Sequence, residues 1–177
     1  MASFDELARR MQSPLVAFLE RRFPSRRDAE DVAQEALVRA WQSLASFREG
    51  KRFRTWVFTI AYRLAVSRGR ARAMGGTTGE LPIDAADTAD SPLDLMQRRE
   101  REENIWAVAG AVLSSEQVEA LWLTYVEEMP ASEVAGVMGR SWVSVKTMLH
   151  RARKKLAPHL AAEVGEERST QRSGGLR

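Results

Sequence analysis

Residues 140–155 have the sequence RSWVSVKTMLHRARKK, in which six residues are Lys or Arg and none is acidic. Apolar residues recur here at the three- and four-residue spacing of a helix that buries one face: Val145, Leu149, Ala152 and Leu156. The other face of the expected helix is therefore polar and positively charged. A basic amphipathic helix by itself is a weak indication of function, because a charged face is usually only a solvated one. The residues before this helix strengthen the indication.

Those preceding residues predict a shorter helix and a tight turn. Pro130 suits the start of a helix, Gly139 suits a left-handed helix end, and Ser141 suits the N-cap of the basic helix. Apolar residues lie at helical spacing between them: Val134, Ala135 and Met138. Further upstream, Ser114 and Gln117 form a capping-box pattern that opens another helix. A short helix, a glycine turn and a basic helix in this order are typical of a helix-turn-helix unit that binds duplex DNA.

A second basic stretch, residues 51–72, contains seven Lys or Arg and no acidic residue. The spacing predicts a helix over about residues 53–70 with one inward apolar face: Trp56, Ile60 and Leu64. An aromatic residue on a helix is usually part of the core, and Trp56 fits that interpretation. We expect Phe58 and Tyr62 to lie away from this face, beside arginines. Such a surface suits a phosphate backbone and unstacked bases, so the stretch indicates binding of single-stranded nucleic acid.

The first fifty residues predict three further helices. Ser3 and Glu6 form a capping-box pattern for a helix that should end near Pro14, and Pro14 suits the first turn of a second helix. A third helix follows Ser25 and has the strongest apolar pattern in the chain: Ala29, Val32, Ala33, Ala36, Leu37, Ala40, Trp41 and Leu44. Its opposite face is acidic. One interpretation is that these acids only complement the positive end of the helix dipole.

Charge divides the chain into segments. Residues 1–72 contain 15 basic and 8 acidic side chains, residues 73–97 contain none and 5, and the remaining 80 residues contain 12 and 11. The middle segment is also rich in Gly and Pro, which is typical of a linker. We therefore expect an all-α protein in which two small helical domains, 1–72 and 98–160, are joined by a flexible acidic linker, 73–97. The second domain contains the helix-turn-helix, and the polar composition of the tail, 161–177, predicts disorder.

The composition also argues against several classes of protein. Zero cysteines exclude disulfides and thiolate metal sites, and two histidines cannot form a His-based site alone, so we expect no metal and no cofactor. No apolar run reaches the length of a signal peptide or the roughly 18 residues of a membrane span, which predicts a cytoplasmic protein without membrane insertion. No Ser/His/Asp arrangement, phosphate-binding Gly loop or metal-ligand spacing indicates an enzyme.

Several runs of the sequence resemble conserved regions of one family. Two runs resemble the second region of bacterial sigma factors, in the short two-domain group called extracytoplasmic-function (ECF) sigma factors: DAEDVAQEALVRAW at 28–41 and FRTWVFTIA at 53–61. Three more resemble the fourth region of these proteins: LSSEQ at 113–117, EVA at 133–135 and VKTMLHRARKKL at 145–156. The resemblance covers about residues 5–160, with the regions in the order that the family has.

The resemblance implies two kinds of partner, core RNA polymerase and promoter DNA in duplex and melted form. In such proteins the helix that matches 28–44 docks on the clamp helices of the large polymerase subunit, which implies polymerase contacts by Asp31, Gln34, Glu35 and Leu37. The turn and helix that match 47–72 recognise and open the minus-ten element, which implies contacts by Phe47, Arg54, Phe58, Tyr62 and Arg63. The last helix binds the minus-thirty-five element in the major groove, which implies contacts by Arg140, Ser141, Lys146, Thr147, His150, Arg151, Arg153 and Lys154.

Some residues depart from the family pattern and leave the promoter sequence open. The family often has Asn at the position of Arg63, Gly at Val143, an apolar residue at Arg140 and Arg at Met148. The regulon, the inducing signal and an inhibitory anti-sigma partner are not readable from the sequence. The alternative function is a stand-alone helix-turn-helix regulator whose N-terminal domain dimerises or senses a ligand. Such a regulator would bind a palindromic duplex alone, whereas a sigma factor requires polymerase for specific binding.

Overall fold

The computed structural model describes residues 4–23, 25–47, 52–75 and 104–173, with side chains described only to residue 71 before the gap and to 161 after it. All regular elements in these ranges are helices, which confirms the all-α prediction. The elements are α1 (Phe4–Leu19), α2 (Arg26–Gln42), the 3-10 helix η1 (Leu44–Ser46), α3 (Phe53–Gly75), a helical segment at 104–112, α5 (Ser115–Tyr125), α6 (Ala131–Met138) and α7 (Trp142–Ser173). Most of the predicted acidic linker, from residue 76 onward, lies outside the described residues.

The N-terminal domain packs α1, α2 and α3 around one apolar core. Phe18 of α1 and Phe58 of α3 meet edge to face with ring centroids 5.3 Å apart. The buried face of α2 consists mainly of small residues, which lets the neighbouring helices approach closely: Ala29, Val32, Ala33, Ala36 and Ala40. Ser25 is the N-cap of α2, and its side-chain oxygen accepts a hydrogen bond from the Asp28 amide at 3.1 Å, so α2 begins after Ser25 as predicted.

The predicted break at Pro14 is wrong, because α1 runs through it to Leu19. A proline inside a helix removes one backbone hydrogen bond and costs about 3 kcal/mol. The apolar stripe continues on both sides of Pro14, with Met11 and Leu15 each buried, so burial of one continuous face outweighs that cost. The other half of the predicted capping box, Ser3, lies outside the described residues.

The C-terminal domain follows its local signals closely. The capping box of α5 is confirmed, with the Gln117 amide donating to the Ser114 hydroxyl at 3.4 Å and the Ser114 amide donating to the Gln117 side chain at 3.2 Å. Pro130 is the N-cap of α6, and Gly139 ends it in the left-handed conformation with φ of 62°. The Ser141 hydroxyl accepts a hydrogen bond from the Ser144 amide at 3.2 Å and caps α7, also as predicted.

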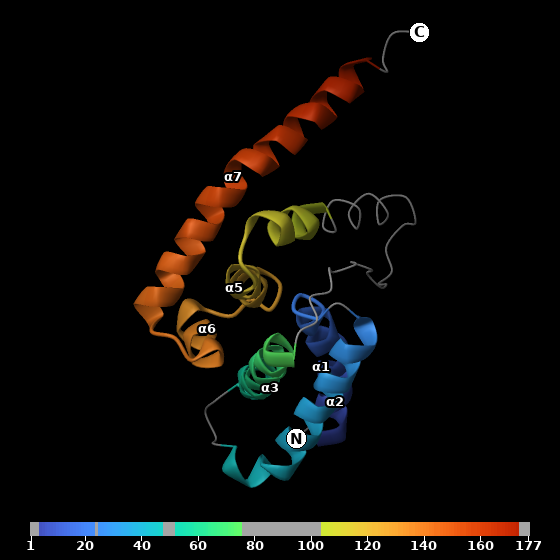
Figure 1. Cartoon of the computed structure of the whole chain (residues 1–177), viewed down its shortest axis with the longest axis vertical. Helices are drawn as coiled ribbons and strands as arrows, with labels where there is room; N and C mark the ends of the chain where they lie inside the picture. Colours follow the sequence, from blue (N-terminus) through green and yellow to red (C-terminus); the bar gives the residue numbers. More distant parts are fainter. Residues whose placement is uncertain (1–3, 24, 48–51, 76–103, 174–177) are drawn as a thin grey trace.

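The last helix is longer than the sequence indicated. We expected a disordered tail from residue 161, but α7 continues as a helix to Ser173. The prediction relied on polarity, whereas a helix that is already nucleated by packed turns extends readily through residues with high helix propensity such as Ala, Glu and Arg. In Figure 1, α7 passes α5 and α6 and extends beyond them, so its final turns lie away from both domains.

Figure 1 also shows α3 lying between the pair α1 and α2 and the C-terminal helices α5 and α6. Helix α3 packs against α1 and α2 on one side and against α6 on the other. The two domains are thus in contact, and α3 is the helix of the N-terminal domain that packs against the C-terminal domain. This arrangement determines which predicted site residues are exposed.

Candidate nucleic-acid interface

The first half of α7 presents a continuous basic surface. All the residues predicted to contact duplex DNA are exposed: Arg140, Ser141, Lys146, Thr147, His150, Arg151, Arg153 and Lys154. The inner face is buried against α5 and α6, as the spacing predicted: Val145, Leu149, Ala152 and Leu156. The glycine turn before α7 and the cap at its start orient this surface away from the domain. Such a helix can enter the major groove of duplex DNA.

Two of the basic residues at the edges of this surface already have protein partners. Arg140 donates two hydrogen bonds to the Glu116 carboxylate at 2.6 and 2.8 Å, and these raise the pKa of Arg140. Arg153 donates to the Leu149 carbonyl at 3.2 Å and to the Tyr125 hydroxyl at 3.3 Å. Guanidinium groups held in place in this way suit contacts to phosphates, because phosphate contacts fix the orientation of the protein on DNA and do not require a side chain to extend to a base edge.

The predicted single-strand residues of α3 divide between the core, the domain contact and the surface. Phe58 is fully buried against Phe18, so the prediction that it lies away from the apolar face is wrong. The reason is that other helices pack on two sides of α3, so more than one face of this helix is buried. Arg54 donates through Nε to Glu127 at 2.8 Å, Tyr62 is 6% exposed, and Arg63 is exposed.

Phe47, the remaining predicted single-strand residue, lies half-buried in an aromatic cluster before α3. Its ring centroid is 5.9 Å from that of Phe53 and 5.0 Å from that of Trp56, and Phe4 contacts Phe53 at 5.9 Å. The cluster packs Phe47 and Phe4 against the first turn of α3. Trp56 is partly buried and packs against the core, which agrees with its predicted inward position.

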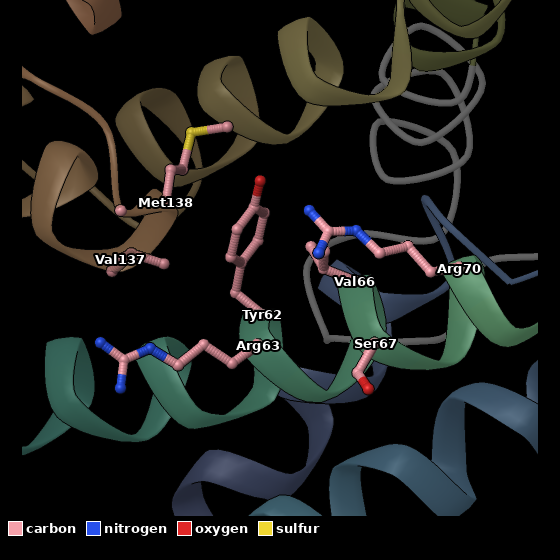
Figure 2. Close-up of a pocket in the computed structure, with 8 residues that line it drawn as sticks. Tyr62, Arg63, Val66, Ser67, Arg70, Val137 and Met138 are labelled. Carbon is pink, nitrogen blue, oxygen red and sulfur yellow. The ribbon is translucent and has the colours of Figure 1, made fainter.

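A cavity of about 360 Å³ lies between α3 and α6. Residues from both helices line it: Tyr62, Arg63, Val66, Ser67, Arg70, Val137, Met138 and Gly139. Figure 2 shows the Tyr62 ring directed from α3 toward Met138, with the Arg70 guanidinium beside the ring and the Arg63 side chain pointing away from it along α3. Burial, together with the charge of Glu119, raises the pKa of Tyr62 and keeps its phenol protonated. An aromatic ring with arginines from the same helix in one cavity suits an unstacked base attached to phosphate.

Buried carboxylates of α5 and the following turn hold arginines of the N-terminal domain. Arg22 donates to both oxygens of Glu119 at 2.6 Å, and Glu119 is only 1% exposed. The Trp122 indole donates to the buried Glu127 at 3.2 Å, and Glu127 also accepts from Arg54. Arg22 and Glu119 are 97 residues apart in the chain, and Arg54 and Glu127 are 73 apart. No local sequence pattern indicates that such distant residues pair, so the sequence did not predict either contact.

The pKa values of Arg22 and Glu119 are both raised, which favours the charged form of the arginine but the neutral form of the carboxyl. Burial raises the pKa of the Glu119 carboxyl more than the hydrogen bonds from Arg22 lower it. For Arg22, burial lowers the pKa, but the bonds to Glu119 outweigh it and the pKa is raised. The geometry favours the charged pair, because two parallel bonds at 2.6 Å are typical of a guanidinium facing a carboxylate.

Helix α2 presents a second exposed surface, on the side away from the core. Among the predicted polymerase-binding residues, Asp31 and Gln34 are exposed and Leu37 is half-buried. Glu35 accepts a hydrogen bond from Arg39 at 2.6 Å and also pairs with Arg68 of α3. These bonds outweigh the effect of burial and lower the pKa of Glu35.

Two apolar residues extend this surface of α2. Val38 is 47% exposed and Trp41 is 63% exposed. We had placed Trp41 on the buried face, and that prediction is wrong because the core ends at Ala40 and leaves the ring outside. Asp31, Gln34, Val38 and Trp41 follow one another at three- or four-residue spacing, so helical periodicity applied to the polar face could have identified the stripe.

The part of the chain that the structure describes shows neither a metal-binding cluster nor a membrane-spanning helix. No group of three or more His, Asp or Glu side chains there could hold a metal ion. Within the same residues, no helix combines the length and the apolarity that a membrane crossing requires.

Two family models match the described domains. The model for sigma-70 region 2 matches residues 7–74, which include α2 and most of α1 and α3, and the model for sigma-70 region 4 matches 111–156, which include α5, α6 and the first half of α7. The chain is an ECF sigma factor. As a member of this family, it binds core RNA polymerase and directs it to promoters.

Individual relatives agree with this assignment. The sigma factor is 29% identical to the RNA polymerase sigma factor YlaC of Bacillus subtilis over 168 residues, which is 94% of this chain and 96% of that protein. It is 31% identical to the ECF sigma factor SigG of Mycobacterium tuberculosis over 164 residues, which is 80% of this chain but 44% of SigG. A probable sigma factor of Xanthomonas campestris, RfaY, is 35% identical, and the match spans 32% of its length.

Solved structures share the fold. The sigma factor RpoE of Bartonella quintana, crystallised with the anti-sigma factor NepR, superposes with a TM-score of 0.70 at 24% identity, over 89% of this chain and 96% of that one. CnrH, solved in complex with the cytosolic domain of CnrY, gives a TM-score of 0.62 at 24% identity, over 90% of this chain and 88% of CnrH. The two-domain helical architecture is therefore that of known sigma factors.

Proposed function

We propose that three helices of this sigma factor bind different partners: α2 binds core polymerase, α3 binds the melted minus-ten element, and α7 binds the minus-thirty-five duplex. The observation that carries this proposal is the separation of surfaces: the exposed stripe of α2 lies in region 2, and the basic surface of α7 lies in region 4. One chain can then contact polymerase and two promoter elements at the same time. We assign the two functional units to residues 1–72 and 98–160.

The polymerase contact combines charge with an apolar anchor. Asp31 and Gln34 provide polar groups, and Trp41 provides a large exposed ring at the end of the same stripe. Aromatic residues that remain exposed in a free protein are frequent energetic centres of interfaces. Glu35 contributes indirectly, because its bonds to Arg39 and Arg68 tie α2 to α3.

Promoter opening requires the two domains to separate. Tyr62 and Arg54 are covered or paired by the C-terminal domain in this structure, and both belong to the predicted minus-ten surface. Separation exposes Tyr62 next to Arg63 and Arg70, which are already exposed, and the three side chains can then accept a base that leaves the duplex. Capturing unstacked bases favours melted DNA over paired DNA and offsets part of the cost of unstacking.

The chain performs no bond chemistry in this scheme. It supplies differential binding, and polymerase catalyses the synthesis of RNA. The template lies in the bacterial cytoplasm, which is where we place the protein. Since RpoE, a solved sigma factor with this fold, was crystallised with the anti-sigma factor NepR, we also propose that an anti-sigma protein controls this chain.

The test uses purified core polymerase and an Asp31→Lys, Trp41→Ala double variant. We expect the variant to remain helical and to lose co-purification with core polymerase. Gln12→Lys is the control, because Gln12 is exposed on α1, outside α2, and should tolerate the change. Retention of parental polymerase affinity by the double variant would refute the assignment of α2. Specific binding of the chain alone to a palindromic duplex would instead support the stand-alone regulator.

A further inference from the structure

Two large apolar side chains are exposed side by side at the start of α7. Trp142 is 51% exposed and Val143 is 65% exposed, and they are the first two residues of the helix. Single exposed apolar residues are normal on protein surfaces and need no explanation. Two such residues that begin a helix with a basic surface are a more specific arrangement, because both lie where that helix would first meet DNA.

Their position is the one from which a recognition helix contacts base edges. In helix-turn-helix proteins the N-terminal residues of the second helix lie deepest in the major groove. Gly139, with φ of 62°, and the Ser141 cap set the direction in which α7 begins. Lys146 and Thr147 lie one turn further along and are also exposed, so they share a face with the apolar pair.

The charge around this pair favours DNA over an apolar protein partner. The Lys146 ammonium lies 4.3 Å from the centre of the Trp142 ring, so a cation accompanies the ring. His150 and Arg151 continue the exposed polar surface along the helix. An apolar patch bordered by cations fits a groove that is negatively charged at its rims and contains apolar groups at its floor.

We propose that Trp142 and Val143 contact the 5-methyl groups of thymines in the upstream promoter element and thereby add a preference for thymine. The thymine methyl is the apolar group that base edges present in the major groove, whereas the side chains of Lys146 and Arg151 bind polar acceptors. This inference rests on the proposed function of α7. It goes beyond it by assigning sequence preference to residues outside the basic surface.

The experiment replaces thymine with deoxyuridine, which lacks only the methyl group. An upstream element is first selected from a randomised library with the parental holoenzyme. Each thymine is then replaced singly, and holoenzyme binding is measured by competition. We expect parental affinity to fall about fourfold at each contacted position, as expected for one buried methyl group. Trp142→Ala and Val143→Ala should bind the thymine template more weakly and show a reduced difference between thymine and deoxyuridine.

Val126→Ala is the matched control, because Val126 is 42% exposed at the end of α5, in the same domain but outside α7. It should retain the full methyl dependence. The proposal is overturned if parental affinity is the same on thymine and deoxyuridine at every position, or if both variants keep the parental difference. It is also overturned if Trp142→Ala reduces binding to core polymerase, since the ring would then contact protein. Loss of the proposed function itself has a separate signature, because Lys146→Ala and Arg151→Ala would then leave promoter binding unchanged.

Discussion

The contact between the two domains should depend strongly on Glu119. The side chain of Glu119 is 2% exposed and that of Arg22 is 18% exposed. Replacing Glu119 with Ala leaves the Arg22 guanidinium mostly buried without a counter-charge for as long as the domains remain together. Removing one partner of a buried pair costs about 3–5 kcal/mol. When the domains separate, Arg22 returns to water and the penalty disappears. The two domains of the variant should therefore separate under conditions in which each domain stays folded.

A cost of about 3 kcal/mol corresponds to a roughly 150-fold shift of the closed-to-open ratio toward the open form. The chain contains no cysteine, so dye pairs can be attached at single introduced cysteines. Gln12→Cys on α1 and Ala157→Cys on α7 are exposed positions in different domains. Energy transfer between the dyes should fall in Glu119→Ala, while the circular dichroism of the helices stays close to the parental signal.

The matched control is Glu116→Ala on the same helix. Glu116 also pairs with an arginine, but the side chains of Glu116 and Arg140 are 41% and 45% exposed, and solvent screens such a pair. Energy transfer in this control should stay close to the parental value. If Glu119→Ala and Glu116→Ala both keep the parental energy transfer, the buried pair does not hold the domains together and the reasoning fails.

Three further predictions address the promoter surfaces and the turn before α7. Tyr62→Ala and Arg63→Ala should impair open-complex formation on duplex promoters and lose less on a template with a pre-melted bubble; equal loss on both templates would contradict a role in base capture. Across a library of upstream elements, Arg151→Ala should weaken the base preference at one or two positions. Lys154→Ala should instead lower transcription from all promoters alike and reduce the slope of log affinity against log salt concentration by about one. An equal loss at every promoter in both variants would favour recognition by shape and charge. Gly139→Ala should destabilise the chain by about 1 kcal/mol in denaturant unfolding, because φ is 62° and a Cβ there meets open space, leaving backbone strain as the cost; an unchanged midpoint would contradict this.

The amino-acid sequence by itself determined the elements that depend on neighbouring residues. The predictions agree with the structure at four places: the start of α2 after Ser25, the capping box at Ser114 and Gln117, the left-handed end at Gly139 and the buried stripe of α7. Caps, turns and helical stripes act over a few residues, so their chemistry is complete within a short stretch of sequence. The resemblance to sigma factor regions was equally local, and it identified the family.

Only the tertiary structure decided which faces of those helices remain available. Phe58 is buried because α3 is enclosed from two sides, and Trp41 is exposed because the core ends one residue before it. Arg22 and Glu119 are 97 residues apart in the chain and meet only because α3 joins the two domains. Burial and ion pairing depend on which elements pack together, and that is a property of the whole fold that no local spacing of residues contains.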